Sequence, residues 1–361
     1  MHPEQAAILQ TISENPGDDT VRLIFADWLE ERGDTTRAQF IRYQIDAHQR
    51  PWTDPQRGRL DAIVRQMLLD HEAIWRLERP EIAGVRRLGY YRGWCDHFSI
   101  DDASALRHAD RLFESGPVDE LVFDRIDEQS LGLLIGCPYL SRVRSLRFNP
   151  HAIRPVDLVG FLMHAQLDRL EQLVLRDQGI YNEVPIVLAE QAHLPNLRRL
   201  DLSVNYIGQP GIERFAQSSR LPSLSYLSLF RNRIGDAGVE ALTHAPHLQE
   251  LDELELQNTY LGDKGCVALA KSNLWKRSRT LNLCYNRIGN KGAQAIANCS
   301  HLSDVEILVL RANSIKDAGA VALAQSPHLR NLKSLEINCN PFKARGRERL
   351  ISSFSERVHF E

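Results

Sequence analysis

The residues of this 361-residue chain that could do chemistry are thirteen histidines, six cysteines and pairs of carboxylates. No HExxH segment and no Cys/His pair at zinc spacing occurs, so the sequence predicts no metal site. It contains neither a GxxxxGK[ST] phosphate loop nor a Gly-x-Ser-x-Gly nucleophile elbow. Glu253 and Glu255 would project to one face if they lie on a strand, which is the geometry that general acid–base chemistry needs. What this pair can do depends on the surface that carries it.

An internal repeat determines that surface. A leucine recurs eight times with a constant spacing of 27 residues, and its positions are Leu146, Leu173, Leu200, Leu227, Leu254, Leu281, Leu308 and Leu335. Leu121 precedes the series by 25 residues, and we interpret 95–100 as a degenerate earlier strand. Such a period indicates a solenoid of stacked supersecondary units.

Each unit follows the same physical logic. The alternation Leu200-x-Leu202 predicts a short strand with one buried face. Asp236, Asp263, Asn290 and Asp317 recur where an N-cap of the following helix is expected. Because His193, His247, His301 and His328 share one phase of the repeat, we interpret them as structural members of the return loop. Cys266, Cys284, Cys299 and Cys339 are expected to behave as small hydrophobic side chains.

The phrase Asn232-Arg-Ile-Gly-Asp-Ala-Gly-Val-Glu-Ala-Leu242 resembles the leucine-rich repeat family, in its ribonuclease-inhibitor-like subtype, and the resemblance covers roughly residues 118–345. It implies an α/β fold: a right-handed solenoid, or horseshoe, with parallel strands on the concave face and helices on the convex face. It also implies a structural ladder of buried asparagines at Asn205, Asn232, Asn286, Asn313 and Asn340. Amides there would satisfy backbone groups that the sharp turn leaves unpaired. Thr259 interrupts this ladder.

The N-terminal part has no repeat and predicts three helices, at about 3–14, 19–32 and 35–49, followed by a fourth at about 58–79. Asn15-Pro16, the run from Arg22 to Asp34 and Phe40-Ile-Arg42 resemble the repeat-companion domain of expanded bacterial protein families. That resemblance implies a context and no biochemical activity. We expect a small all-helical companion module at 1–50 and a linker with the N-terminal solenoid cap at 51–117. The 27-residue leucine-rich repeats would follow at 118–340 and a C-terminal cap at 341–361.

Composition narrows the class of protein further. The net charge of −3 gives no global attraction for nucleic acid or an anionic membrane, and no apolar run reaches the roughly 18 residues of a membrane span. The N-terminus lacks a basic segment followed by an apolar one, so no signal peptide is expected. The sequence therefore predicts a cytoplasmic protein that binds neither nucleic acid nor membrane.

The concave face is the surface on which function is expected. The strand positions beside each marker leucine, and three residues beyond it, should be exposed there. We predict partner binding by Tyr226, Phe230, Arg231, Glu253, Glu255, Gln257, Tyr285 and Arg311. Tyrosine and arginine are enriched at binding hot spots. An open concave surface excludes water poorly, which argues against catalysis by the glutamates and against an enzyme.

The sequence thus favours a non-enzymatic scaffold that binds a protein partner of unknown identity on the concave face and holds no cofactor. One alternative is a regulator that inhibits or activates a partner enzyme such as a nuclease or a GTPase. A second is self-assembly, in which the N-terminal module docks chains together through Trp28 and its neighbours. The sequence leaves the oligomeric state open.

Overall fold

The computed structural model describes residues 2–15, 17–51 and 54–360. Pro16 of the Asn15-Pro16 motif therefore lies outside the described residues. The chain forms two compact units. Unit 1 comprises Met1–Phe148 and Ala165–Leu170, and unit 2 comprises Asn149–His164 and Glu171–Glu361.

Unit 1 begins with four helices, α1 (Pro3–Glu14), α2 (Asp19–Glu31), α3 (Thr35–Gln49) and α4 (Pro55–Trp75). Aspartates cap three of them, because the side chains of Asp18, Asp34 and Asp54 accept backbone N–H groups in the first turns of α2, α3 and α4. The fourth helix begins at Pro55 rather than at 58, since this cap starts it. It ends at Trp75 and continues as a 3-10 turn, η1 (Arg76–Glu78).

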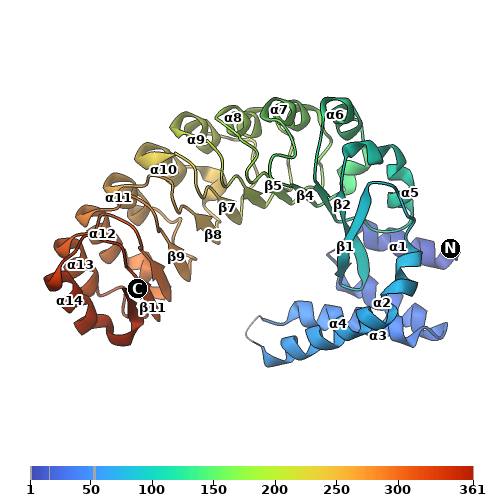
Figure 1. The fold of residues 1–361 in the computed structure, drawn as a ribbon, viewed down its shortest axis with the longest axis horizontal. Helices are drawn as coiled ribbons and strands as arrows, with labels where there is room; N and C mark the ends of the chain where they lie inside the picture. The colour runs from blue at the N-terminus through green and yellow to red at the C-terminus, as the bar shows by residue number, and fades with distance from the viewer. Residues whose placement is uncertain (1, 16, 52–53, 361) are drawn as a thin grey trace. The chain divides into compact units, whose positions relative to one another are not determined.

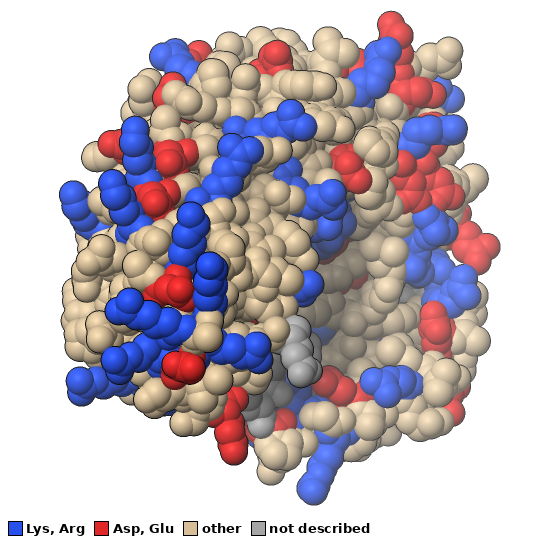
Figure 2. Space-filling view, turned by 60° about the vertical axis from the view of Figure 1, so that its left-hand side comes forward, with Lys and Arg blue, Asp and Glu red and all other residues tan. Residues whose placement is uncertain are grey.

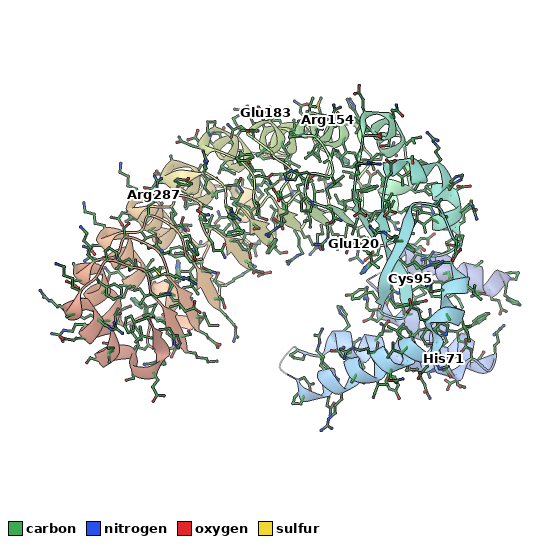
Figure 3. All side chains as sticks on the ribbon, in the orientation of Figure 1. His71, Cys95, Glu120, Arg154, Glu183 and Arg287 are labelled. Carbon is green, nitrogen blue, oxygen red and sulfur yellow. The ribbon has the colours of Figure 1, made fainter. Side chains whose placement is uncertain are left out.

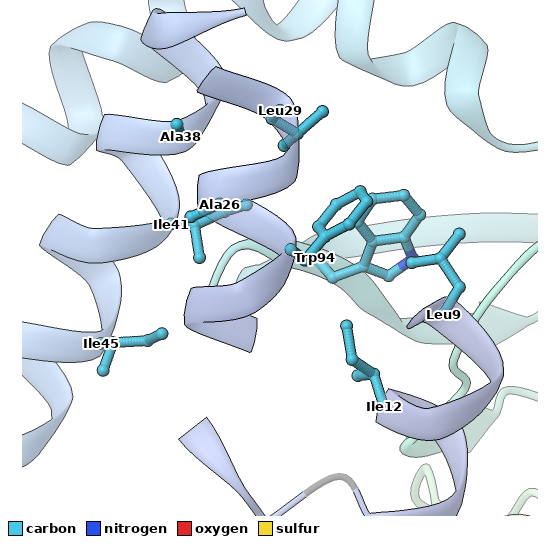
Figure 4. Packing of buried hydrophobic residues seen from close by; sticks show 9 residues of the cluster. Leu9, Ile12, Ala26, Leu29, Ala38, Ile41, Ile45 and Trp94 are labelled. Atoms are coloured by element: carbon cyan, nitrogen blue, oxygen red, sulfur yellow. The ribbon is translucent and has the colours of Figure 1, made fainter. Parts of the chain in front are cut away.

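The first three helices pack around an apolar cluster that Trp94 completes (Figure 4): Leu9, Ile12, Phe25, Ala26, Leu29, Ala38, Ile41, Ile45 and Trp94. Buried arginines surround this core. Arg22 contacts Asp96 at 3.3 Å, and both side chains are almost fully buried. Burial raises the pKa of Asp96 and lowers that of Arg22, while their mutual attraction opposes both shifts. Arg37 is fully buried, and its guanidinium lies 4.6 Å from the ring centroid of Trp75.

A small sheet follows the helices of unit 1. Strands β1 (Val85–Tyr91) and β2 (Trp94–Ile100) form an antiparallel hairpin, and β3 (Glu120–Phe123) and β4 (Ser145–Phe148) continue it in parallel. The earlier strand expected at 95–100 is present as β2, whose Phe98 pairs with Leu121. The sequence pattern did not predict β1. Short helices complete the unit: η2 (Ala103–His108), α5 (Ala109–Glu114), α6 (Glu128–Ile135) and η3 (Pro138–Arg142).

Unit 2 alternates strand and helix along the solenoid. Its strands are β5 (Gln172–Val174), β6 (Arg199–Asp201), β7 (Tyr226–Ser228), β8 (Glu253–Glu255), β9 (Thr280–Asn282), β10 (Ile307–Val309), β11 (Ser334–Glu336) and β12 (Val358–His359). Its α-helices are α7 (Pro155–His164), α8 (Glu183–Glu190), α9 (Gln209–Ala216), α10 (Gly235–Thr243), α11 (Asp263–Lys271), α12 (Asn290–Ala297), α13 (Asp317–Ala324) and α14 (Ala344–Phe354). The 3-10 helices are η4 (Pro246–Leu248), η5 (Ser300–Asp304) and η6 (Ser355–Arg357). Within this unit the strands line the inside of the curve and the helices the outside, which confirms the expected α/β solenoid (Figure 1).

The leucines of the repeat place the strands of unit 2 in register. Leu173, Leu200 and Leu227 pair in sequence with one another across parallel strands, and Leu308 pairs with Leu335. All five side chains are fully buried. A constant 27-residue period keeps every leucine at the same level of the core, so each turn covers the apolar face of the one before it. Among the described residues, no helix has both the length and the apolar character needed to cross a membrane.

Candidate functional site

Strands β7 and β8 hold the predicted glutamate pair. The hydroxyl of Tyr226 donates to Oε2 of Glu255 at 3.2 Å, and Oγ of Ser228 donates to the same oxygen at 2.5 Å. Burial, reinforced by the carboxylates of Glu255 and Asp201, raises the pKa of Tyr226, so its phenol remains a donor. Glu253 is exposed. Glu255 is therefore a positioned acceptor on the concave face.

Some strand positions that we expected to be exposed are buried. Ser228 and Ser203 are 0% and 1% exposed, and Val122 and Val174 are also buried. The reason is that parallel strands lie only about 4.8 Å apart, so small or β-branched side chains are covered by longer neighbours on the adjacent strands. Fewer residues of the concave face are therefore exposed than the sequence pattern indicated.

Five of the eight predicted partner-binding residues line one hollow of about 570 Å³ in unit 2, which we call the concave hollow. They are Phe230, Arg231, Glu255, Gln257 and Tyr285, and its other lining residues are Arg176, Asn258, Asn282 and Cys284. Arg311 adjoins it, with its guanidinium 5.6 Å from the ring centroid of Tyr285. Tyr226 and Glu253 do not line the hollow, although Tyr226 holds Glu255.

Three residues that line the concave hollow have a left-handed backbone conformation shortly after a strand. Arg231, Asn258 and Tyr285 have φ of 55°, 53° and 56°, and they occupy the same position in successive turns. The backbone N–H of Arg231 still donates to the carbonyl of Gln257 at 3.0 Å, so the turns remain joined here. The hollow is therefore built on hydrogen-bonded backbone and not on a loose loop.

Arginines that lie over aromatic rings are the second feature of this surface. Arg176 and Arg231 lie 5.9 and 6.0 Å from the ring centroid of Phe230. The same pairing occurs outside the hollow, at 4.2 Å, between Arg199 and Tyr226 and between Arg287 and Tyr260 (Arg287 is labelled in Figure 3). Among the described residues, the structure gives no carboxylate within 4 Å of these guanidinium groups. Their N–H donors thus remain available to a ligand.

The sequence reading did not select Arg176, Arg199, Tyr260 or Arg287. Nor did it select Tyr181 and Tyr206, whose exposed rings stack with centroids 5.2 Å apart. Tyr206 and Tyr260 each follow a ladder position by one residue, and this recurrence was the signal that could have identified them. Surface charges of both signs are intermingled on the side of the molecule that Figure 2 shows.

Comparison with known proteins agrees with this geometry. A family model described as Leucine Rich repeat matches residues 193–216, 220–242 and 279–297. The turns within these three ranges are similar to leucine-rich repeats. Stacked repeats of this kind create extended concave surfaces that are used for binding. No curated protein matches the chain.

Solved structures to which this chain is similar include an internalin (inlF) from Listeria monocytogenes. It has 19% sequence identity and a TM-score of 0.47, and the match covers 73% of this chain and 72% of that chain. Rad7, in its complex with Elc1 from yeast, has 14% identity and a TM-score of 0.44, over 97% of this chain and 84% of that chain.

The ladder asparagines tie their turns to the preceding ones. Oδ1 of Asn286 accepts the backbone N–H groups of Thr259 and Leu261 at 2.9 and 3.1 Å, and its Nδ2 donates to the carbonyl of Leu256 at 2.8 Å. The same type of bonding to the preceding turn occurs at Asn205, Asn232, Asn313 and Asn340. Thr259 is fully buried, and its hydroxyl donates to Leu256 at 2.8 Å. The threonine hydroxyl thus binds the carbonyl of its own turn that an asparagine amide would bind at this position.

The predicted N-caps act differently from expectation. Asp263 is the first residue of α11, and its Oδ1 accepts the N–H groups of Gly289 and Gly292, both at 2.7 Å, at the start of α12. Asn290 and Asp317 do the same for the next helices, and Asp236 accepts from Gly262. Each of these side chains therefore caps the helix of the following repeat and not its own. A Cβ at Gly292 would lie 2.8 Å from this Oδ1, which explains the recurrent glycine.

Histidines and cysteines build no reactive centre among the residues that the structure describes. His247 is buried against Phe215, and no group of three or more His, Cys, Asp or Glu side chains in the described ranges could hold a metal ion. Burial raises the pKa of the Cys95 thiol to about 11 and also raises the pKa of Cys266, so neither is activated as a thiolate.

A second hollow of about 710 Å³ lies on the helical side of the repeats, around α10 and α11. Glu240, Lys264 and Lys271 are among its lining residues. Its lining contains no Phe, Tyr or Trp, and lysine is depleted at protein interfaces. This composition makes it a natural comparison site for the concave hollow.

Proposed function

We propose that this protein is a non-enzymatic scaffold that binds a partner protein on the concave face of its leucine-rich repeats. The observation that carries the proposal is the concave hollow, in which Phe230, Arg231 and Tyr285 meet. Tyrosine and arginine are the residue types that most often dominate binding energy when a partner desolvates them. The strands and their ladder hold these side chains in place, which lowers the entropic cost of binding.

The chemistry of the hollow also indicates what the partner offers. Arg176 and Arg231 lie over an aromatic ring without a carboxylate of this chain beside them, whereas Glu255 already accepts two hydroxyl groups. A partner segment that inserts an apolar side chain beside Phe230 and carries a carboxylate would satisfy both features, because a guanidinium binds carboxylates through two parallel hydrogen bonds.

We infer two further points of classification. The 27-residue period, with an α-helix on each turn from α7 to α13, supports the ribonuclease-inhibitor-like subtype of the repeat. The caps and core of α1–α3 give structural roles to Asp34, Phe40 and Ile41 of the companion-domain motif, which supports a companion module at 1–50. The solenoid cap at 51–117, the repeats at 118–340 and the C-terminal cap at 341–361 are the boundaries that go with this division.

The test is affinity capture followed by measurement with the purified partner. Wild type is compared with a Phe230→Ala/Arg231→Ala/Tyr285→Ala variant, and a Glu240→Ala/Lys264→Ala/Lys271→Ala variant of the helical-side hollow is the matched control. We expect the concave variant to lose at least 100-fold in affinity for the partner, about 2.7 kcal/mol, since each hot-spot residue contributes 1–2 kcal/mol or more. The control should bind as wild type does.

Circular dichroism must show that all three proteins are folded. Equal capture by the wild type and the concave variant would refute the proposal. A loss confined to the control variant would move the site to the helical side.

A further inference from the structure

Helix α4 is unusual in how little of its surface is covered. It has 21 residues, yet Trp75 is the only one of its described side chains that is buried. Trp75 packs on Phe40 of α3, with ring centroids 4.6 Å apart, and His71 stacks on Trp75 (His71 is labelled in Figure 3). One side of α4 is therefore fixed to the helices of unit 1.

A second apolar stripe runs along the adjacent side of α4. It consists of Leu60, Ile63, Met67 and Ile74, and Leu77 of η1 continues it; Leu60 and Met67 are half-buried, where the stripe borders the packed side. Ile63, Ile74 and Leu77 are 43%, 66% and 84% exposed. The spacing of three, four, seven and three residues is that of a heptad seam, with Asp70 at the one polar position. Such a seam is typical of a helix that packs lengthwise against another helix.

The charges of α4 indicate what that other helix is. From Pro55 to Arg65 the helix carries three arginines and one aspartate, and from Gln66 to Trp75 it carries Asp70 and Glu72 without a basic residue other than histidine. The formal charges of these two segments of α4 are thus +2 and −2, and Arg76 of η1, between Ile74 and Leu77, adds one positive charge beyond the acidic segment. A second copy of the same helix, running antiparallel, would place each basic half beside an acidic half.

The position of Asp70 in the seam also supports an antiparallel orientation. In a parallel pair the two Asp70 side chains would face each other at one level of the seam, which like-charge repulsion disfavours. In an antiparallel pair Asp70 lies nearer the basic half of its partner. The arrangement is self-complementary about a twofold axis, as an isologous dimer requires.

Trp28, through which the self-assembly alternative would dock chains together, is occupied within its own chain. Its Nε1 donates to Glu4 at 3.1 Å, the guanidinium of Arg32 lies 4.1 Å above its ring, and the ring stacks on Phe25. The apolar stripe of α4, and not Trp28 of α2, is therefore the candidate surface for self-assembly.

We propose that two copies of this chain associate through an antiparallel seam formed by Leu60, Ile63, Met67, Ile74 and Leu77 of each copy. The seam spans 18 residues, about 27 Å of helix. Because this is fewer than three heptads, the dimer forms with a dissociation constant on the order of micromolar. The concave hollow plays no part in it.

Sedimentation of the full chain from 1 to 100 µM tests the proposal. We expect the average mass of the wild type to rise from 41.1 kDa toward twice that value. An Ile74→Asp/Leu77→Asp variant should remain at the monomer mass. The control is Leu69→Asp, on the same helix and 76% exposed but off the seam, which should assemble like the wild type.

A charge exchange tests the choice of partner. Arg59→Glu/Arg65→Glu and Asp70→Lys/Glu72→Lys should each weaken self-association at least tenfold, and an equimolar mixture of the two variants should assemble again. A wild type that stays monomeric at 100 µM overturns the proposal. So does assembly that survives in the Ile74/Leu77 variant, or a mixture that fails to recover.

Discussion

Replacement of His247 by leucine should remove much of the acid sensitivity of the repeat unit. His247 lies in η4 and is 4% exposed, and its ring packs edge-on against Phe215 with centroids 5.1 Å apart. Burial lowers its pKa to about 4, with the neighbouring backbone of Ser218 acting weakly in the opposite direction. The folded protein therefore holds this imidazole neutral under conditions in which the unfolded chain binds a proton.

The sign and size of the effect follow from linkage. In the unfolded chain a histidine has a pKa of about 6.5, so as the pH falls the unfolded state is protonated first. Stability from this residue is complete above about pH 6.5 and is lost as the pH falls toward 4. The difference between the two pKa values corresponds to about 3 kcal/mol in total, of which about 2 kcal/mol is lost between pH 7.5 and pH 5.

Urea unfolding followed by circular dichroism at pH 7.5 and pH 5.0 measures this contribution. The fall in the free energy of unfolding between the two pH values should be about 2 kcal/mol smaller in His247→Leu than in the wild type. His328→Leu, at the same repeat position but half-buried, is measured beside it as the matched variant. An unchanged pH dependence in His247→Leu, or a His247 ring that titrates near pH 6.5 in NMR, would refute the reasoning.

Two substitutions test the other features of the repeats by the same urea assay. Asp263→Ala should cost about 1 kcal/mol, because the N–H groups of Gly289 and Gly292 lose their acceptor, whereas Asp263→Asn should be nearly neutral. A loss as large in the asparagine variant would show that charge and not capping matters. Val204 has a left-handed φ of 57°, so Val204→Asn, which supplies the residue already present at Asn258, should stabilise by about 1 kcal/mol. A less stable variant would mean that side-chain packing of the valine outweighs its backbone strain.

The strands of the solenoid were predictable because their signal is local and repeated. A leucine such as Leu200 marks both the buried face and the register, so 27-residue spacing alone predicts the parallel pairing. The hairpin strand β1 carries no such repeat, and its apolar residues are only half-buried or exposed, so no periodicity distinguished it.

The candidate site was predictable only in part, for a physical reason. Sequence spacing shows which residues leave a strand on one side, but not how their neighbours cover them. Ser228 is buried because Glu255 and Tyr226 close over it, and Arg176 joins the hollow from two turns away by lying over Phe230. The caps were misassigned because Asp263 has the sequence position of an N-cap, while its side chain reaches the following turn.

The joints between turns have a consequence for how such a chain can change its length. At a complete joint, such as the one between the turns that carry α11 and α12, one side chain reaches forward, as Asp263 does to Gly289, and one reaches back, as Asn286 does to Thr259. An insertion of a few residues within a turn would separate one of these bonds from the other. Gain or loss of a whole 27-residue block restores both at once, and the new neighbours meet with the same two bonds. The array can therefore lengthen or shorten by complete turns while every remaining joint keeps its geometry.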